Sequence, residues 1–228
     1  MTDPEAPREP PKRMHIEFLA AAAYDGIVTR ERMEEHWRLL RGPDARLDDE
    51  LFDKAVALAR ILNTPASKKI DMASKRGVAK AQASRDPALW HQATMAALAY
   101  RGDKHGFLPW VLQQAETDRA TAGWIFLWAE GSRYLRGETD FLLDHISSEN
   151  MVALFDAVCE RSEGMGFAND ALGLDPGFEA ERLNCLAVIA NGQLAPGIVA
   201  PKALLERPFD PPRQDDRFRM DDGIILCA

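Results

Sequence analysis

The chain has 228 residues, of which 46% are hydrophobic, and its 36 acidic residues outnumber its 28 basic residues for a formal net charge of -8. A chain of this length holds one large domain or two small ones, and it can bury a core without disulfide bonds or metals. No apolar run approaches the roughly 20 residues that a membrane span needs, and the acidic balance disfavours nucleic acid and anionic membranes as partners while it suits a basic protein.

The first part of the chain predicts a disordered segment followed by helices. Residues 1–13 are dominated by proline and charge and lack the apolar stretch of a secretory signal. Residues 14–63 predict an N-terminal helical portion, in which Thr29 and either Asp48 or Asp49 can cap two helices. The apolar residues expected on the buried helix faces are Ile16, Leu19, Ala20, Ala23, Met33, Trp37, Leu40, Leu51, Ala55, Leu58, Ala59 and Leu62.

Residues 64–85 differ in composition from their surroundings. Their only acid is Asp71, and large apolar residues are few. The basic residues are Lys68, Lys69, Lys75, Arg76, Lys80 and Arg85. The segment therefore predicts a basic linker or weak helix that separates the N-terminal portion from the main domain.

Residues 86–206 predict the main helical domain. Asp86 followed by Pro87 is a helix start, since Asp accepts a backbone hydrogen bond at the N-cap and Pro suits the first helical position. Asp118 can cap the next long helix, whose residues 120–129 are apolar on every face, so this helix must be buried. Either Ser147 or Ser148 can cap another helix.

The last segment, residues 207–228, is a Pro-rich acidic tail that ends in a short apolar run, a strand or a packed terminus. Sustained alternation of apolar and polar residues is otherwise missing from the sequence. The predicted fold is all-α: a compact multi-helix domain with an N-terminal helical extension and an irregular C-terminal tail.

One family resemblance lies in residues 90–135, which hold four of the five tryptophans. An aromatic and acidic-glycine turn at 100–107 precedes a helix at 109–116, and Asp118 precedes a small-residue apolar helix that leads to Ala129-Glu130-Gly131 and Tyr134-Leu135. This arrangement resembles the DUF4274 family, a helical domain of unknown function in bacterial proteins. The family's usual acidic pair before the turn glycine is replaced here by Gly102-Asp103 and Lys104-His105. The resemblance implies helical packing and, because some such domains occur beside bacterial toxin systems, an immunity-like role.

A candidate pocket follows if the turn before residue 109 folds over the end of the tryptophan-rich helix. Histidine and carboxylate groups near aromatic walls are typical of acid–base or metal pockets. The candidate residues are Asp103, His105, Trp110, Glu130 and Arg133, which His91 and His145 could join.

The structural interpretation of the same turn is the favoured one. Gly106 would let the chain reverse at positive φ, Asp103 would accept backbone N–H groups, and His105 would pack beside Trp110. No sequence motif of a hydrolase, zinc protease or phosphate-binding loop supports catalysis.

Metal and cofactor sites are not predicted. The acidic pairs Asp48-Asp49, Asp215-Asp216 and Asp221-Asp222 fit no calcium loop and are read as caps and solvated charge. The scattered Cys159, Cys185 and Cys227 have no zinc spacing and are typical of reduced thiols in a cytoplasmic protein. The basic run at 68–85 lacks the interleaved aromatic residues of a nucleic-acid surface.

The sequence therefore predicts a non-enzymatic cytoplasmic binding protein, immunity-like, that sequesters a basic protein partner such as a toxin. The alternative is a small-molecule-binding or catalytic pocket around Asp103, His105 and Glu130. The oligomeric state stays open.

Overall fold

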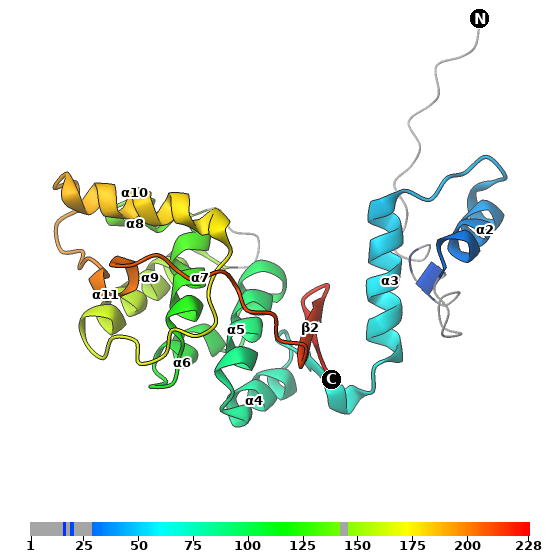
Figure 1. Ribbon diagram of the computed structural model, residues 1–228, viewed down its shortest axis with the longest axis horizontal. Helices are drawn as coiled ribbons and strands as arrows, with labels where there is room; N and C mark the ends of the chain where they lie inside the picture. The colour runs from blue at the N-terminus through cyan, green and yellow to red at the C-terminus, as the bar shows by residue number, and fades with distance from the viewer. Residues whose placement is uncertain (1–15, 17–18, 21–28, 142–145) are drawn as a thin grey trace, which may run out of the picture. The chain divides into compact units, whose positions relative to one another are not determined.

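The computed structural model describes residues 16, 19–20, 29–141 and 146–228. The chain divides into two units, an N-terminal unit up to Lys68 and a C-terminal unit over Lys69–Ala228. Helices dominate both, as the sequence predicts, and a small three-stranded sheet is added to them (Figure 1). Within the described ranges, no helix combines the length and hydropathy that crossing a bilayer requires. The predicted disorder of residues 1–13 lies outside the described residues, as do Ala23 and His145.

The N-terminal unit contains helices α2 (Arg30–Arg41) and α3 (Asp49–Asn63). Both predicted N-caps are confirmed: the Thr29 side chain accepts from the N–H of Arg32, and the Asp48 side chain accepts from the N–H of Leu51. The helices share a small core made of Leu19, Met33, Trp37, Leu47, Leu51 and Ala55. Leu40 and Leu62, expected on buried faces, are exposed instead.

Over its described residues, the C-terminal unit contains eight α-helices. Their bounds are α4 (Lys75–Ser84), α5 (Pro87–Ala96), α6 (Phe107–Leu112), α7 (Arg119–Trp128), α8 (Gly131–Leu135), α9 (Ser148–Glu163), α10 (Glu179–Ala190) and α11 (Lys202–Leu205). Short helical turns are η2 (Ala66–Lys68), at the end of the N-terminal unit, and η3 (Ala97–Arg101, a π-helical turn) and η4 (Pro176–Phe178) in the C-terminal unit. Asp86, Asp118 and Ser147 each cap the helix that follows them, as predicted.

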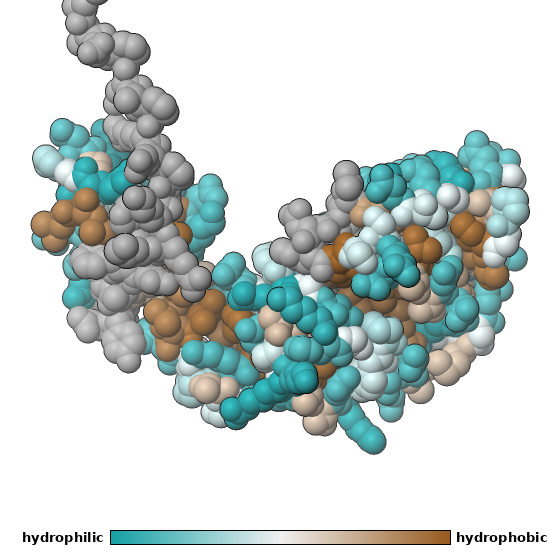
Figure 2. Space-filling view, turned by 180° about the vertical axis from the view of Figure 1, so that it is seen from behind, coloured by the Kyte–Doolittle hydropathy of each residue, from teal (hydrophilic) through white to brown (hydrophobic). Residues whose placement is uncertain are grey.

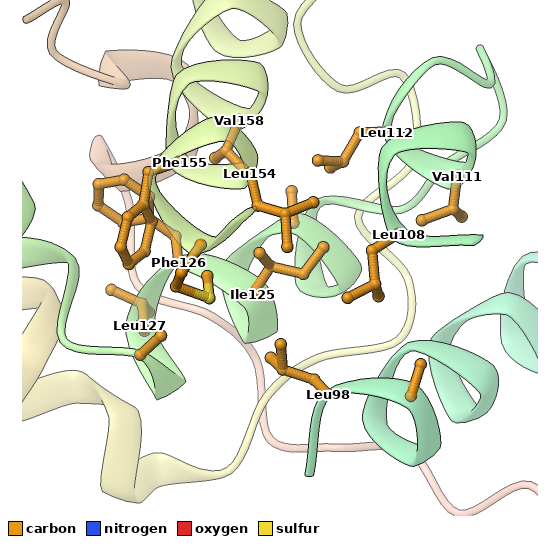
Figure 3. Packing of buried hydrophobic residues seen from close by; sticks show 14 of the residues in the cluster. Leu98, Leu108, Val111, Leu112, Ile125, Phe126, Leu127, Leu154, Phe155 and Val158 are labelled. Carbon is orange, nitrogen blue, oxygen red and sulfur yellow. The ribbon is translucent and has the colours of Figure 1, made fainter. Parts of the chain in front are cut away.

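The core of this unit lies between α6, α7 and α9. Figure 3 shows Leu108 of α6, Ile125 and Phe126 of α7, and Leu154 and Phe155 of α9 pointing toward one another. All five are buried, and the Phe126 and Phe155 rings meet edge to face at 5.3 Å. The prediction that the tryptophan-rich helix is buried is thus confirmed for α7, although Trp124 and Trp128 themselves are only partly buried.

The segment at 64–85 is more ordered than a linker. The boundary between the units does fall inside it, but strand β1 (Lys69–Asp71) and helix α4 occupy most of it. Four residues anchor it in the core of the C-terminal unit: Ile70, Met72, Val78 and Ala81. Of the two predicted alternatives, a basic linker or a weak helix, α4 agrees with the helix, and β1 is an element that the basic composition does not indicate.

The C-terminal tail is also not irregular throughout. Strands β2 (Phe218–Asp221) and β3 (Ile224–Cys227) form a hairpin, and β1 pairs with the other edge of β3, giving the antiparallel order β1-β3-β2. Ile225 lies opposite both Ile70 and Met220. The red C-terminal strands lie next to α5 in Figure 1 and contact it. The C-terminal tail therefore contributes two strands that pair with β1 and contact α5.

Candidate functional site

The turn before α6 has the structural geometry that the sequence predicts. The two carboxylate oxygens of Asp103 accept hydrogen bonds from the backbone N–H groups of Phe107 (2.7 Å) and Leu108 (2.9 Å). Gly106 has a φ of +69°, in the left-handed region that favours glycine. Burial raises the pKa of Asp103, while the two backbone hydrogen bonds and nearby His105 oppose that shift. Asp103 thus caps α6 in place of a side chain at Gly106.

Glu130 and Arg133 form a separate cluster where α7 turns into α8. The Arg133 guanidinium donates to Glu130 (2.8 Å) and Glu138 (2.6 Å), and it stacks over the ring of Phe141. The hydrogen bonds to Glu130 and Glu138 raise the pKa of Arg133. These are exposed pairs of the kind that contributes little to stability.

The candidate pocket residues are not all brought together. A cavity of about 380 Å³ lies between the turn before α6 and the N-terminal half of α9, and Asp103, Lys104 and Gly106 line one side of it. Its lining does not include His105, Trp110, Glu130 or Arg133. Trp110 instead packs its ring against Trp90 (5.3 Å) and Phe107 (5.6 Å).

His91 lies buried in the C-terminal unit. Its Nδ1 contacts the hydroxyl of Thr121 at 3.2 Å, and its ring meets Trp124 edge to face. Burial lowers its pKa from 6.5 to about 4, against a smaller opposing effect of Asp118. His91 is therefore a neutral core residue near neutral pH.

The outer face of α9 carries acidic residues that the sequence reasoning did not single out. Glu149, Asp156, Glu160 and Glu163 are exposed and occur at i, i+7, i+11 and i+14, which places them on one side of the helix. The sequence contains this helical spacing of acidic residues alongside the apolar stripe that marks the buried side of the helix. We call these four residues the acidic face of α9.

The acidic face is little neutralised by the protein itself. Across the described parts of the chain, no basic side chain forms an ion pair with Glu149, Glu160 or Glu163, and Asp156 accepts a hydrogen bond from the hydroxyl of Tyr134. Burial raises the pKa of the Cys159 thiol to about 12, and the negative charges of Asp156, Glu163 and Glu160 add to this shift. Three of the four carboxylates of the face therefore act on one neighbouring group.

Three arginines of the C-terminal unit are buried, and two of them, Arg119 and Arg182, form ion pairs with Asp170 and Glu179. Arg119, Arg161 and Arg182 are each at most 5% exposed. Each donates to backbone carbonyl oxygens, including Arg119 to Leu204 (2.8 Å) and Arg161 to Leu112 (2.8 Å). Their guanidinium groups satisfy the ends of helices and loops and are not available to contact a partner.

The acidic pairs have local partners. Asp48 caps α3, Asp215 accepts from Arg217, and Asp221 pairs with Arg219. No group of three or more metal-ligating side chains is assembled among the residues that the structure describes. The three cysteines are all free thiols, two of them buried.

Comparison with known proteins adds no relative. No family model, no curated protein and no solved structure matches this chain. The resemblance of residues 90–135 to DUF4274 therefore stays a prediction.

Proposed function

We propose that this is a non-enzymatic, cytoplasmic binding protein that uses the acidic face of α9 to sequester a basic protein partner. The observation that carries the proposal is the position of Glu160 and Glu163 in the last turn of α9. The carbonyl end of a helix is electrically negative, so acidic side chains there cost roughly 0.3–1 kcal/mol each. Acidic residues in this position, exposed and without ion-pair partners in the described part of the chain, are costly for stability and suited to binding.

The charge balance of the surrounding chain supports the same function. Residues 86–206 contain 17 acidic and 8 basic residues, a formal net charge of -9. Three of those 8 basic residues are the buried arginines Arg119, Arg161 and Arg182. A surface of this sign attracts basic proteins over a distance and speeds their association.

The basic residues of the unit are spread over several elements, and one of them, Lys104, lines the cavity between α6 and α9. Lys75 and Arg76 are exposed on α4. This cluster has no interleaved exposed aromatic side chains on which bases could stack, so it does not favour nucleic acid as the partner. The face of the C-terminal unit seen in Figure 2 carries hydrophilic residues with hydrophobic patches among them.

The immunity-like role is one form of this function. A protein that neutralises a basic toxin needs fast association with an acidic surface, and the acidic face provides the charge. The free, mostly buried thiols fit the cytoplasmic part of the proposal.

A binding titration with model polymers tests the proposal. The full chain is titrated with an oligolysine peptide, an oligoglutamate peptide and a DNA duplex at low and at near-physiological salt. We expect binding of oligolysine that weakens with salt, and no binding of the other two at near-physiological salt. Tight binding of the duplex at near-physiological salt, or no binding of oligolysine even at low salt, would reject it.

The cavity between α6 and α9 supports a second candidate, a small-molecule site. Its volume of about 380 Å³ is at the lower end of the range for ligand pockets, and Asp103 supplies a polar group in its wall. Both carboxylate oxygens of Asp103 are already occupied by backbone N–H groups, which makes this candidate the weaker one.

A further inference from the structure

The cavity and the acidic face of α9 are continuous through one residue. Ala153 is exposed on the outer side of α9, between Glu149 and Asp156 in sequence, and it also lines the cavity. Asn150, which follows Glu149 directly, lines the cavity as well. A partner that lies along the acidic face therefore also reaches residues that line the cavity.

The wall of the cavity is suited to an apolar side chain. Pro109 of α6, Ile146 just before α9, and Ala153 and Leu154 of α9 contribute apolar surface. Ser147 and Asn150 contribute polar groups, and Asp103 and Lys104 add an acidic and a basic side chain. Ser147 already accepts the N–H of Asn150 as the N-cap of α9. Leu154 belongs to the buried core, so the floor of the cavity is the core itself.

The two features together define the chemistry of one occupant. Interfaces obtain most of their affinity from a few apolar or aromatic side chains seated in pockets, and charges around them set specificity and association rate. The only partner that satisfies both features is a segment that is basic and carries an apolar residue at the right place. A purely polar basic segment would leave the cavity unfilled, and an acidic amphipathic segment would be repelled by the acidic face.

We infer that the cavity between α6 and α9 receives one large apolar side chain, aromatic or leucine-like, of the basic partner, while lysine or arginine residues on both sides of it face Glu149, Asp156 and Glu160. This inference rests on the proposed function and specifies the partner's sequence chemistry. It predicts that a basic segment without an apolar residue binds by charge alone and weakly.

Two peptides of equal charge test the inference. Both consist of lysine and alanine, and one has a central phenylalanine where the other has alanine. We expect the phenylalanine peptide to bind the full chain about fivefold more tightly or better, because a seated aromatic anchor is worth at least that much. Dissociation constants come from calorimetric titration at low salt.

A cavity-filling variant locates the effect. Ala153→Trp places a large side chain at the mouth of the cavity, and Ala187→Trp, at an exposed position of α10, is the matched control. The measured quantity is the ratio of the dissociation constant of the alanine peptide to that of the phenylalanine peptide. We expect this ratio to fall to nearly one in Ala153→Trp and to stay as high as in the unaltered chain in Ala187→Trp. The smaller change Ala153→Leu should give an intermediate preference, which keeps the test valid if the tryptophan disturbs folding.

The possible failures are distinguishable. Equal binding of both peptides by the unaltered chain overturns the anchor and leaves the proposed function in place. No binding of either peptide rejects the proposed function and the anchor with it. A preference that survives Ala153→Trp means that phenylalanine binds elsewhere, which overturns the inference. Indole is the probe for a small-molecule site: if it binds the unaltered chain but not Ala153→Trp, while the two peptides bind equally, the cavity is such a site and the inference is wrong.

Discussion

The Asp103 carboxylate accepts a hydrogen bond of 2.7 Å from the backbone N–H of Phe107 and so fixes the start of α6. The second oxygen does the same for Leu108, so one side chain satisfies two of the N–H groups that a helix leaves unpaired at its start. The residue that sequence patterns suggest as a pocket acid is thus already engaged in forming the turn.

Removing this cap should destabilise the protein. We expect Asp103→Ala to lower the free energy of unfolding by about 1–2 kcal/mol, as the loss of an N-cap does. His105→Ala, two residues away at a partly exposed site, should change it by less than about 0.5 kcal/mol. Urea denaturation of both variants measures the difference. A stable His105→Ala protein that has lost its binding of oligolysine would contradict the structural role of this turn.

Gly106 tests the same turn through the backbone alone. A Cβ at this position would meet no atom within 4 Å, so any cost of substitution comes from the φ of +69° and not from a clash. We expect Gly106→Val to be less stable than Gly106→Asn by about 1 kcal/mol or more, since asparagine tolerates the left-handed region and β-branched residues do not. Equal melting temperatures of the two variants would show that the turn adopts another conformation.

The buried His91 predicts a pH-dependent stability. Its folded pKa is lowered to about 4 from 6.5, so the unfolded chain binds a proton more readily between these values, and stability is lost as pH falls from about 6.5 to 4. The shift corresponds to about 3 kcal/mol when the loss is complete. In His91→Gln this contribution disappears while an amide can still contact Thr121. The two proteins should therefore have stability curves that converge or cross as pH falls, and parallel curves from pH 7 to 4 would refute the assignment.

Gly77 should not tolerate a side chain. Helix propensity alone favours alanine over glycine in a helix by about 1 kcal/mol. A Cβ on Gly77, however, would lie 2.0 Å from the carbonyl oxygen of Asp71, where β1 passes into α4. We therefore expect Gly77→Ala to cost about 1–3 kcal/mol in spite of its higher propensity. The control is Ala79→Gly, at an exposed position of the same helix, whose change in the free energy of unfolding measures the helix propensity of alanine relative to glycine in α4. A stabilising Gly77→Ala would mean that α4 and β1 are farther apart than the structure shows.

Local features of this fold could be predicted from the sequence, and features that depend on distant partners could not. The caps formed by Thr29, Asp86 and Asp118 could be predicted, because each capping hydrogen bond joins residues only two or three positions apart. The pairing of Ile70 with Ile225 joins residues that are far apart in the chain, so neither short strand has a signal of its own.

The candidate site shows the same limit. The role of Asp103 in its turn is local and was predicted, whereas its separation from the Glu130 and Arg133 cluster depends on how α6, α8 and α9 pack. The acidic face of α9 has a helical spacing that the sequence does contain, but only the structure shows that Glu160 and Glu163 are exposed and without ion-pair partners among the described residues.

The affinity of a double variant on α9 for oligolysine tests the central claim most directly. The α9 variant combines Glu160→Gln and Glu163→Gln. The control variant combines Glu116→Gln and Glu206→Gln, which removes the same amount of charge from exposed positions elsewhere in the unit. The α9 variant should bind roughly five- to tenfold more weakly at low salt, as the loss of two favourable charge contacts implies, and the control should bind nearly as the unaltered chain does. The α9 variant should also melt at the same temperature or higher, because its substitutions relieve the helix dipole. Equal affinities of the two variants would contradict the claim that α9 carries the binding face.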